Sequence, residues 1–155
     1  MRIKKLNIYL LLIICLLMTG CGEDKIKTVA TLEQFTNVVV SKGFTVNDNM
    51  EKYSNADYIT ESKKAVFEDI EIEMIKYTDS SYAEQVQENH IESFDLLKNT
   101  GAHFKKDKGG NYYHYSLVSN ERYMVSSRVD NTLIFFKIML EDKELVDEIL
   151  NELGY

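Results

Sequence analysis

The first twenty residues constrain the fold most, because we do not expect them to be part of it. Arg2, Lys4 and Lys5 give a positively charged start, and residues 6–18 are almost wholly apolar. As a helix this run would extend about 20 Å at ~1.5 Å per residue, whereas a stable membrane span needs about 20 apolar residues. A basic start before a short apolar run is typical of a secretory signal, and the basic end stays on the cytoplasmic side. We therefore expect the fold to be built from the residues that follow.

A cysteine comes directly after the apolar run. The sequence Met18-Thr19-Gly20-Cys21 has a larger apolar residue, two small residues and Cys in that order. It resembles the lipobox of bacterial lipoproteins, although Leu is more common at the position of Met18. The resemblance implies diacylglycerol, with acyl chains such as palmitate, on the Cys21 sulfur and cleavage between Gly20 and Cys21. A thiolate is a good nucleophile for this alkylation, and two or three acyl chains hold a protein stably where one does not.

The resemblance implies a lipid-anchored protein on the extracytoplasmic side of the cell membrane. Two alternatives remain, an uncleaved signal anchor and a cleavage after Ala30 that would release a soluble protein. The expected organisation is a signal peptide (1–20), the lipidated Cys21 with a short tether (21–30) and a single α+β domain (31–155). The remainder of the chain, with its ending NTLIFF…ILNELGY, is similar to small uncharacterised lipoproteins of Gram-positive bacteria. That likeness implies no activity and no site residues.

Charge and cysteine content limit what the mature protein can do. Removing residues 1–20 removes three of the 18 basic residues and none of the 25 acidic ones, which leaves a formal charge of −10. This excess argues against nucleic acid as a partner, since that affinity comes mainly from phosphate neutralisation. It also disfavours adhesion to anionic head groups. Cys15 leaves with the signal and Cys21 carries lipid, so no thiol remains for a disulfide, a catalytic cysteine or a cysteine zinc site.

Helical and strand periodicity alternate along the rest of the chain. A capping box at Thr31–Gln34 begins a helix that stops before Gly43. Longer apolar stripes predict helices over 80–100 and 142–153. Strands are expected at 44–47, 58–61, 66–77, 112–118, 123–129 and 132–140, with a charged turn at 105–111 and a tight hairpin at Asp130-Asn131. The sequence therefore predicts an α+β fold, in which an antiparallel sheet of five to six strands has helices packed on one face (helix–strands–helix–three strands–helix).

The sequence contains no recognisable catalytic or metal-binding set. Its three histidines, His90, His103 and His114, fall on a helix, a loop and a strand without the spacing of zinc ligands, and we expect His90 at the edge of the core. There is no serine elbow and no phosphate-binding glycine pattern. The Gly109-Gly110 pair is interpreted as a hairpin turn. No catalytic residue, metal site or cofactor is therefore assigned.

A row of acidic residues lies on one face of a predicted strand. Asp69, Glu71 and Glu73 alternate with apolar residues. Carboxylates in a row could bind calcium or perform acid–base catalysis, but the strand lacks the turn and the glycine of calcium loops. A solvated face is the favoured interpretation.

If the helices cover one sheet face, the other face is open. We expect Tyr113, Tyr115, Leu117, Tyr123, Val125 and Val129 to point toward the helices. The last strand is apolar on both sides, so either its odd or its even residues reach the open face. The predicted open face comprises Tyr112, His114, Arg128, Phe135, Lys137, Glu71 and Glu73. A mixture of aromatic and charged groups is typical of a protein-binding surface, and the alternative is an ordinary outer face with cross-strand ion pairs.

Three functions are compatible with these patterns. The leading hypothesis is a non-catalytic lipoprotein whose open sheet face binds an envelope protein or a wall component. The second is an envelope hydrolase that uses His114 with Glu71 or Glu73 as an acid–base pair. The third is a structural or inhibitory lipoprotein with no small ligand.

Overall fold

Seven strands build one antiparallel sheet, in the order β1-β2-β3-β7-β6-β5-β4. The computed structural model describes residues 25–155, so Gly20 and Cys21 lie outside the described residues. The strands are β1 (Thr45–Asp48), β2 (Ile59–Phe67), β3 (Ile70–Tyr77), β4 (His103–Lys108), β5 (Tyr112–Ser119), β6 (Arg122–Val129) and β7 (Thr132–Met139). The helices are α2 (Leu32–Ser41), α3 (Ser80–Asp95) and α4 (Lys143–Leu153), with short 3₁₀ turns η1 (Met50–Tyr53) and η2 (Leu140–Asp142). The predicted α+β class and antiparallel sheet are confirmed.

The sheet has more strands than the sequence predicted. The segment 103–108 was expected to be loop and charged turn, but it forms edge strand β4, which pairs with β5 along its whole length. Every residue of β4 is exposed. Because neither face of this strand is buried, its sequence HFKKDK carries no alternation of apolar and polar residues.

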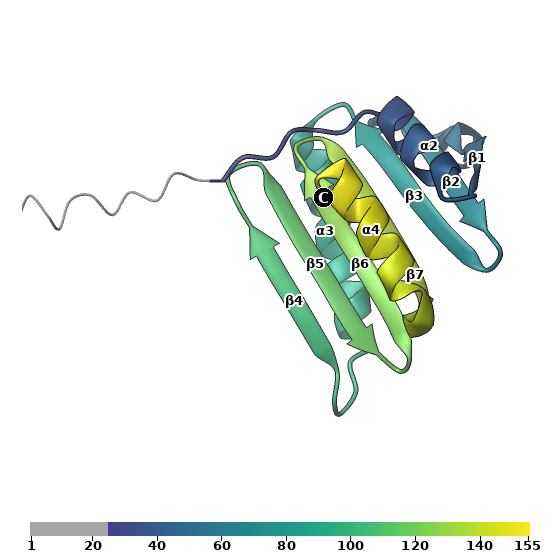
Figure 1. Ribbon diagram of the computed structural model, residues 1–155. Coiled ribbons are helices and arrows are strands. Elements are labelled where there is room, and N and C mark those ends of the chain that lie inside the picture. The colour runs from purple at the N-terminus through teal and green to yellow at the C-terminus, as the bar shows by residue number, and fades with distance from the viewer. Residues whose placement is uncertain (1–24) are drawn as a thin grey trace, which may run out of the picture.

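Helices cover both faces of the sheet, and the prediction of helices on one face is wrong. Figure 1 shows α2 and α4 in front of the sheet and α3 behind it. Ile134 of β7 packs in the cluster under α2 and α4, which we call the α4 face. The adjacent Leu133 packs with Ala83 of α3, on what we call the α3 face. The apolar character of β7 on both sides reflects these two buried faces.

The register of β5 and β6 also corrects the predicted inward-facing set. A tight turn at Asn120 and Glu121, both with positive φ (52° and 59°), joins the two strands. It places His114 opposite Ser127 and Val118 opposite Tyr123. Tyr123, Val125 and Val129 therefore lie on the α4 face, whereas Tyr113, Tyr115 and Leu117 lie on the α3 face. Alternation alone could not decide this, because both strands carry large side chains on both sides.

The predicted ends of α2 and α4 agree closely with the structure, whereas the predicted end of α3 does not. The capping box at the start of α2 is formed, since Gln34 N donates to Thr31 Oγ1 (3.1 Å) and Thr31 N donates to Gln34 Oε1 (2.8 Å). Helix α4 ends at Gly154, whose φ of 78° is left-handed. Helix α3 ends at Asp95, five residues earlier than expected. None of the helices within residues 25–155 is long and apolar enough to cross a membrane.

The segment before α2 lies against the β4–β5 hairpin. Lys27 N donates to Asn111 Oδ1 (2.9 Å) and Asn111 Nδ2 donates to Lys27 O (2.8 Å). Gly110 N donates to Lys25 O (2.9 Å). Much of the predicted tether 21–30 is thus fastened to the domain, and only residues 22–24 lie between the predicted lipid site and the segment that contacts the hairpin.

Candidate functional site

The predicted open face is divided between the two faces of the sheet. Its seven side chains fall into two groups by strand register. Two of them, Tyr112 and His114, lie on the α4 face. The other five, Arg128, Phe135, Lys137, Glu71 and Glu73, lie on the α3 face. A single surface that joins all seven does not exist, because each face carries its own helix layer.

Arg128 is held under helix α3 and is not available to a partner. Its Nη2 lies 3.0 Å from Glu84 Oε1, and its Nη1 donates to Asp130 O (3.2 Å). The side chain is buried, and its Nε has no partner among the described residues. This cation therefore binds α3 to β6.

The acidic row Asp69, Glu71 and Glu73 is not a uniformly solvated strand face, because the predicted strand 66–77 is broken by a turn at 68–69 that contains Asp69. Glu73 is buried and accepts hydrogen bonds from Lys52 (3.0 Å), Tyr53 (2.7 Å) and Ser62 (3.0 Å), and from Asn49 as well. Burial raises the pKa of Glu73, but the hydrogen bonds outweigh it and hold that pKa below its usual value. Glu71, by contrast, is exposed and pairs with Lys64 (2.7 Å).

A hollow of about 330 Å³ opens on the α3 face and gathers four of the predicted residues, Glu71, Glu73, Phe135 and Lys137. His90 of α3 completes it, with its ring centroid 4.4 Å from that of Phe135. Burial lowers the pKa of His90 to about 4, so the imidazole is neutral at pH 7. His90 thus lies at the core edge, as predicted. The charges of the hollow are largely paired, because Glu73 binds Lys52 and Glu71 binds Lys64, which leaves Lys137 as its lining charge without an ion pair among the described residues.

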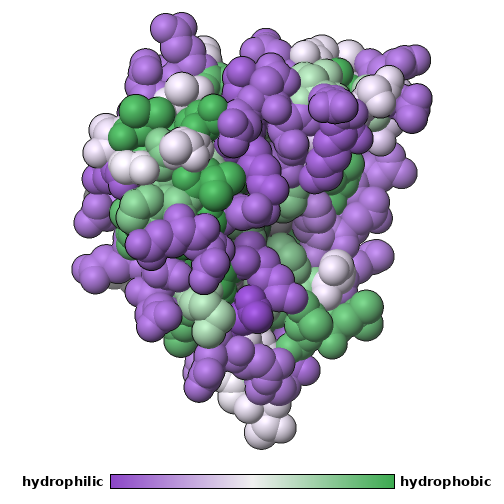
Figure 2. All heavy atoms as spheres, turned by 90° about the vertical axis from the view of Figure 1, so that its right-hand side faces the viewer, coloured by the Kyte–Doolittle hydropathy of each residue, from purple (hydrophilic) through white to green (hydrophobic). Residues whose placement is uncertain are grey.

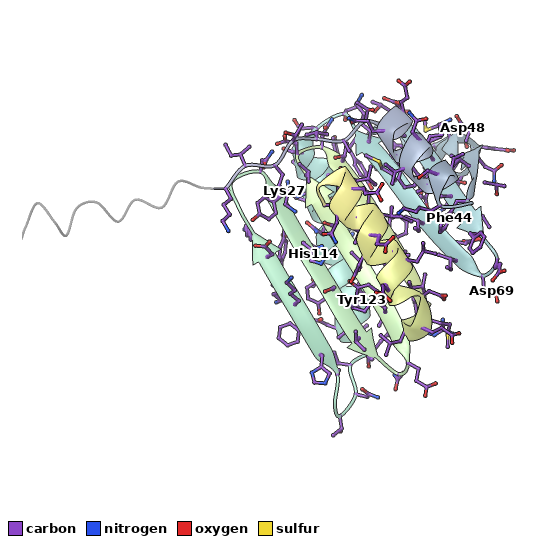
Figure 3. All side chains as sticks on the ribbon, viewed as in Figure 1. Lys27, Phe44, Asp48, Asp69, His114 and Tyr123 are labelled. Carbon is purple, nitrogen blue, oxygen red and sulfur yellow. The ribbon has the colours of Figure 1, made fainter. Side chains whose placement is uncertain are left out.

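A larger groove of about 480 Å³ lies on the α4 face, between α4 and strands β4 and β5. Figure 3 shows Lys27, His114 and Tyr123 along this side of the molecule. We call it the α4 groove. Its polar and charged lining includes Lys27, His103, Lys105, Asp107, His114, Tyr123, Lys143 and Asp147.

The charges of the α4 groove are only partly neutralised. Asp147 accepts a hydrogen bond from Tyr123 OH (2.8 Å) and pairs with Lys143, and burial raises the pKa of Tyr123. Lys27 and Lys105 form no ion pair within residues 25–155. The groove therefore presents two ammonium groups without carboxylate partners.

His114 lies between these lysines and stays neutral. Burial, with a smaller contribution from Lys27 and Lys105, lowers the pKa of His114 to about 4. A neutral imidazole has one nitrogen that donates and one that accepts a hydrogen bond, and it adds no charge of its own to the groove. Two free ammonium groups beside it suit a carboxylate or phosphate group.

A row of Asp107, His114 and Ser127 on three neighbouring strands resembles a catalytic set, but its geometry does not support one. His114 Nδ1 lies 3.2 Å from Ser127 Oγ, and Asp107 is opposite His114 in the register. Ser127 is only 1% exposed, so its hydroxyl cannot meet a substrate. The hydrolase pair of His114 with Glu71 or Glu73 is also wrong, because these carboxylates lie on the other face. No group of three possible metal ligands occurs in the part of the chain that the structure describes.

Sequence reasoning found only His114 among the polar residues of the α4 groove. The others come from β4, β6, α4 and the segment before α2, which no local pattern connects. One signal was present, because a Gly109-Gly110 turn directly before a strand implies a partner strand of similar length before the turn. That partner is β4, which supplies Lys105 and Asp107.

Comparisons with known proteins yield a likeness of shape only. No family model and no curated protein matches this chain. Among solved structures, the chain is similar to the crystal structure of a GTP-binding regulator from Thermotoga maritima. The two share 17% sequence identity, with 80% of this chain and 87% of that chain covered and a TM-score of 0.48.

Proposed function

We propose that this chain is an extracytoplasmic lipoprotein, anchored to the cell membrane through Cys21, whose α4 groove binds an anionic group of an envelope protein or wall component. The observation that carries the binding proposal is the pair of unpartnered lysines, Lys27 and Lys105, beside neutral His114. The lipobox-like sequence supports the anchor. The buried Ser127 and the separation of His114 from Glu71 and Glu73 favour a non-catalytic module.

The anchor is tested by changing its cysteine. Cys21→Ser removes the thiolate that would be alkylated, so the variant should lose the diacylglycerol mass and the cleavage at Gly20. Mass spectrometry of the N-terminal peptide from membrane and soluble fractions measures both. Cys15→Ser is the matched control, because it removes the other thiol and should leave processing intact. A mature, unmodified Cys21 in the wild-type chain would refute the anchor.

The groove is tested with inorganic phosphate and, separately, glutarate as anionic probes. The shift of the His114 ring signals on titration reports binding by NMR. Lys105→Glu should weaken phosphate binding about tenfold or more, since hydrogen bonds to charged groups contribute about 1.5–3 kcal/mol. Lys137→Glu is the control, because Lys137 is exposed on the α3 face and outside the groove. Equal affinities of the two variants would contradict the proposal.

A further inference from the structure

Five lysines gather along edge strand β4 and on the segment beside the β4–β5 turn. We call Lys25, Lys27, Lys105, Lys106 and Lys108 the hairpin cluster. Residues 25–155 contain 15 basic and 23 acidic residues, and the cluster includes a single acid, Asp107. The rest of the domain then has 10 basic residues against 22 acidic ones. The acidic domain is therefore strongly polarised.

The cluster also differs from the other cations in its pairing. None of its lysines forms an ion pair within residues 25–155, whereas eight of the other ten basic residues there do. Instead Lys27 lies over the Tyr112 ring (4.6 Å to the centroid), and Lys108 lies over the Tyr113 ring (5.8 Å). Ile26, between two of the lysines, is 76% exposed. Exposed positive charge around an apolar side chain suits an anionic membrane surface.

The position of the cluster strengthens this reading. Three residues separate Cys21 from Lys25, so their Cα atoms lie at most about 14 Å apart. Figure 1 shows the chain entering the domain beside the tip of the β4–β5 hairpin. The acidic Glu23 and Asp24 of this link reduce the local charge, but link and cluster together remain positive. Figure 2 views the opposite β1 side, where hydrophilic residues predominate.

We propose that the hairpin cluster docks on anionic phospholipid head groups, with Ile26 at the interface, and so fixes the orientation of the domain on the membrane. This inference rests on the proposed anchor at Cys21. The acidic excess that disfavours adhesion to anionic head groups then applies to the sides of the domain away from the hairpin cluster. Each lysine near an anionic surface favours the docked state about fivefold, and salt weakens this by screening.

The test uses the acylated full chain, purified from membranes and reconstituted in vesicles. The chain has no tryptophan, so Ile26→Trp gives a single reporter. Its emission should shift to shorter wavelength and be quenched by brominated lipid in phosphatidylglycerol vesicles, and much less in phosphatidylcholine vesicles. Leu96→Trp is the control, because Leu96 is 87% exposed but lies far from the hairpin cluster. Its neighbour Leu97 accepts a hydrogen bond from Ser119, at the opposite end of β5 from the β4–β5 turn.

Charge variants then test the cluster itself. Lys106→Gln with Lys108→Gln, in the Ile26→Trp background, should lower the ratio of docked to undocked domain about 25-fold. Both side chains lie outside the α4 groove. Lys63→Gln with Lys64→Gln, on β2, is the matched control and should have little effect.

The two proposals fail in different ways. A chain without diacylglycerol that does not float with neutral vesicles would refute the anchor. A chain that floats but emits identically in neutral and anionic vesicles would overturn the docking inference. An emission change caused by soluble polyphosphate and not by anionic vesicles would also overturn it, and would assign the cluster to a soluble polyanion.

Discussion

At the scale of the residue, Glu73 is a buried carboxylate stabilised by donors from the η1 region and from β2. Glu73→Gln keeps the shape but loses the charge that Lys52 and Tyr53 bind. Hydrogen bonds to a charged group contribute about 1.5–3 kcal/mol, so the free energy of unfolding at pH 7 should fall by roughly that amount. Urea denaturation measures it. Glu71→Gln is the control, because Glu71 is exposed and its ion pair contributes about 0–1 kcal/mol.

The effect of Glu73 should depend on pH. Its folded pKa is lowered, while the pKa in the unfolded chain is about 4.3. The stabilisation is therefore complete above the unfolded pKa and is lost as the pH falls through the folded pKa. Below that point the wild-type and Glu73→Gln proteins should converge in stability. A constant difference down to the lowest pH would mean that shape, and not charge, explains the loss.

The two half-buried histidines, His90 and His114, affect stability in a higher pH window. The pKa of His90 and of His114 is about 4 in the fold and about 6.5 in the unfolded chain. Between these values the unfolded chain binds more protons, so stability should decrease as the pH falls from about 6.5 to about 4. NMR titration of the two rings should give midpoints near pH 4. The double variant His90→Gln, His114→Gln should flatten the stability profile in this window, and an unchanged slope would contradict the assignment.

Single residues were predictable where a local pattern decides their environment. His90 was placed correctly at the core edge by its position in the apolar stripe of α3. Glu73 was not, because its donors Asn49, Lys52 and Tyr53 lie in a segment with no apolar periodicity. The burial of a charge depends on such long-range partners.

At the scale of the element, the sequence predicted the features that local chemistry decides. The capping box at Thr31 and the hairpin at Asp130 and Asn131 both form, because side-chain hydrogen bonds and turn conformations are local. Edge strand β4 was missed because its exposed lysines give no apolar alternation. Charged residues on an edge strand also discourage pairing with other chains.

The β4–β5 turn yields a prediction at the same scale. A methyl group at Gly109 would overlap the Tyr112 ring and the Lys25 carbonyl oxygen. Gly109→Ala should therefore displace the segment 25–27 from the hairpin and cost about 1–3 kcal/mol. Hydrogen exchange should show faster exchange of the Lys27 and Gly110 amides, whose acceptors are Asn111 and Lys25.

The neighbouring residue supplies the control for this turn. Lys108→Ala removes an exposed side chain and should leave both amides protected. If the Lys27 and Gly110 amides of the Gly109→Ala variant exchanged at the wild-type rate, the contact between the hairpin and the N-terminal segment would not be formed in solution.

At the scale of the whole molecule, the sheet separates two cores. One cluster lies under α2 and α4, and two smaller clusters lie under α3 on the other side of the strands. The sequence could not assign α3 to its own face, because strands that are apolar on both sides allow helices on either side. The division of the predicted binding residues between two faces follows directly from that ambiguity.

Two adjacent residues of β7 test whether these cores unfold as one unit. Leu133 is fully buried under α3, and Ile134 is fully buried under α2 and α4. Each change to Ala should cost about 2–5 kcal/mol, because it removes side-chain volume from a packed core. Since β7 belongs to both cores, loss of packing on either face weakens the strand that the other face needs. Both variants should then unfold in one transition, with coincident far-UV and tyrosine near-UV signals. Two separated transitions in Leu133→Ala alone would show instead that the α3 layer melts independently of the α4 layer.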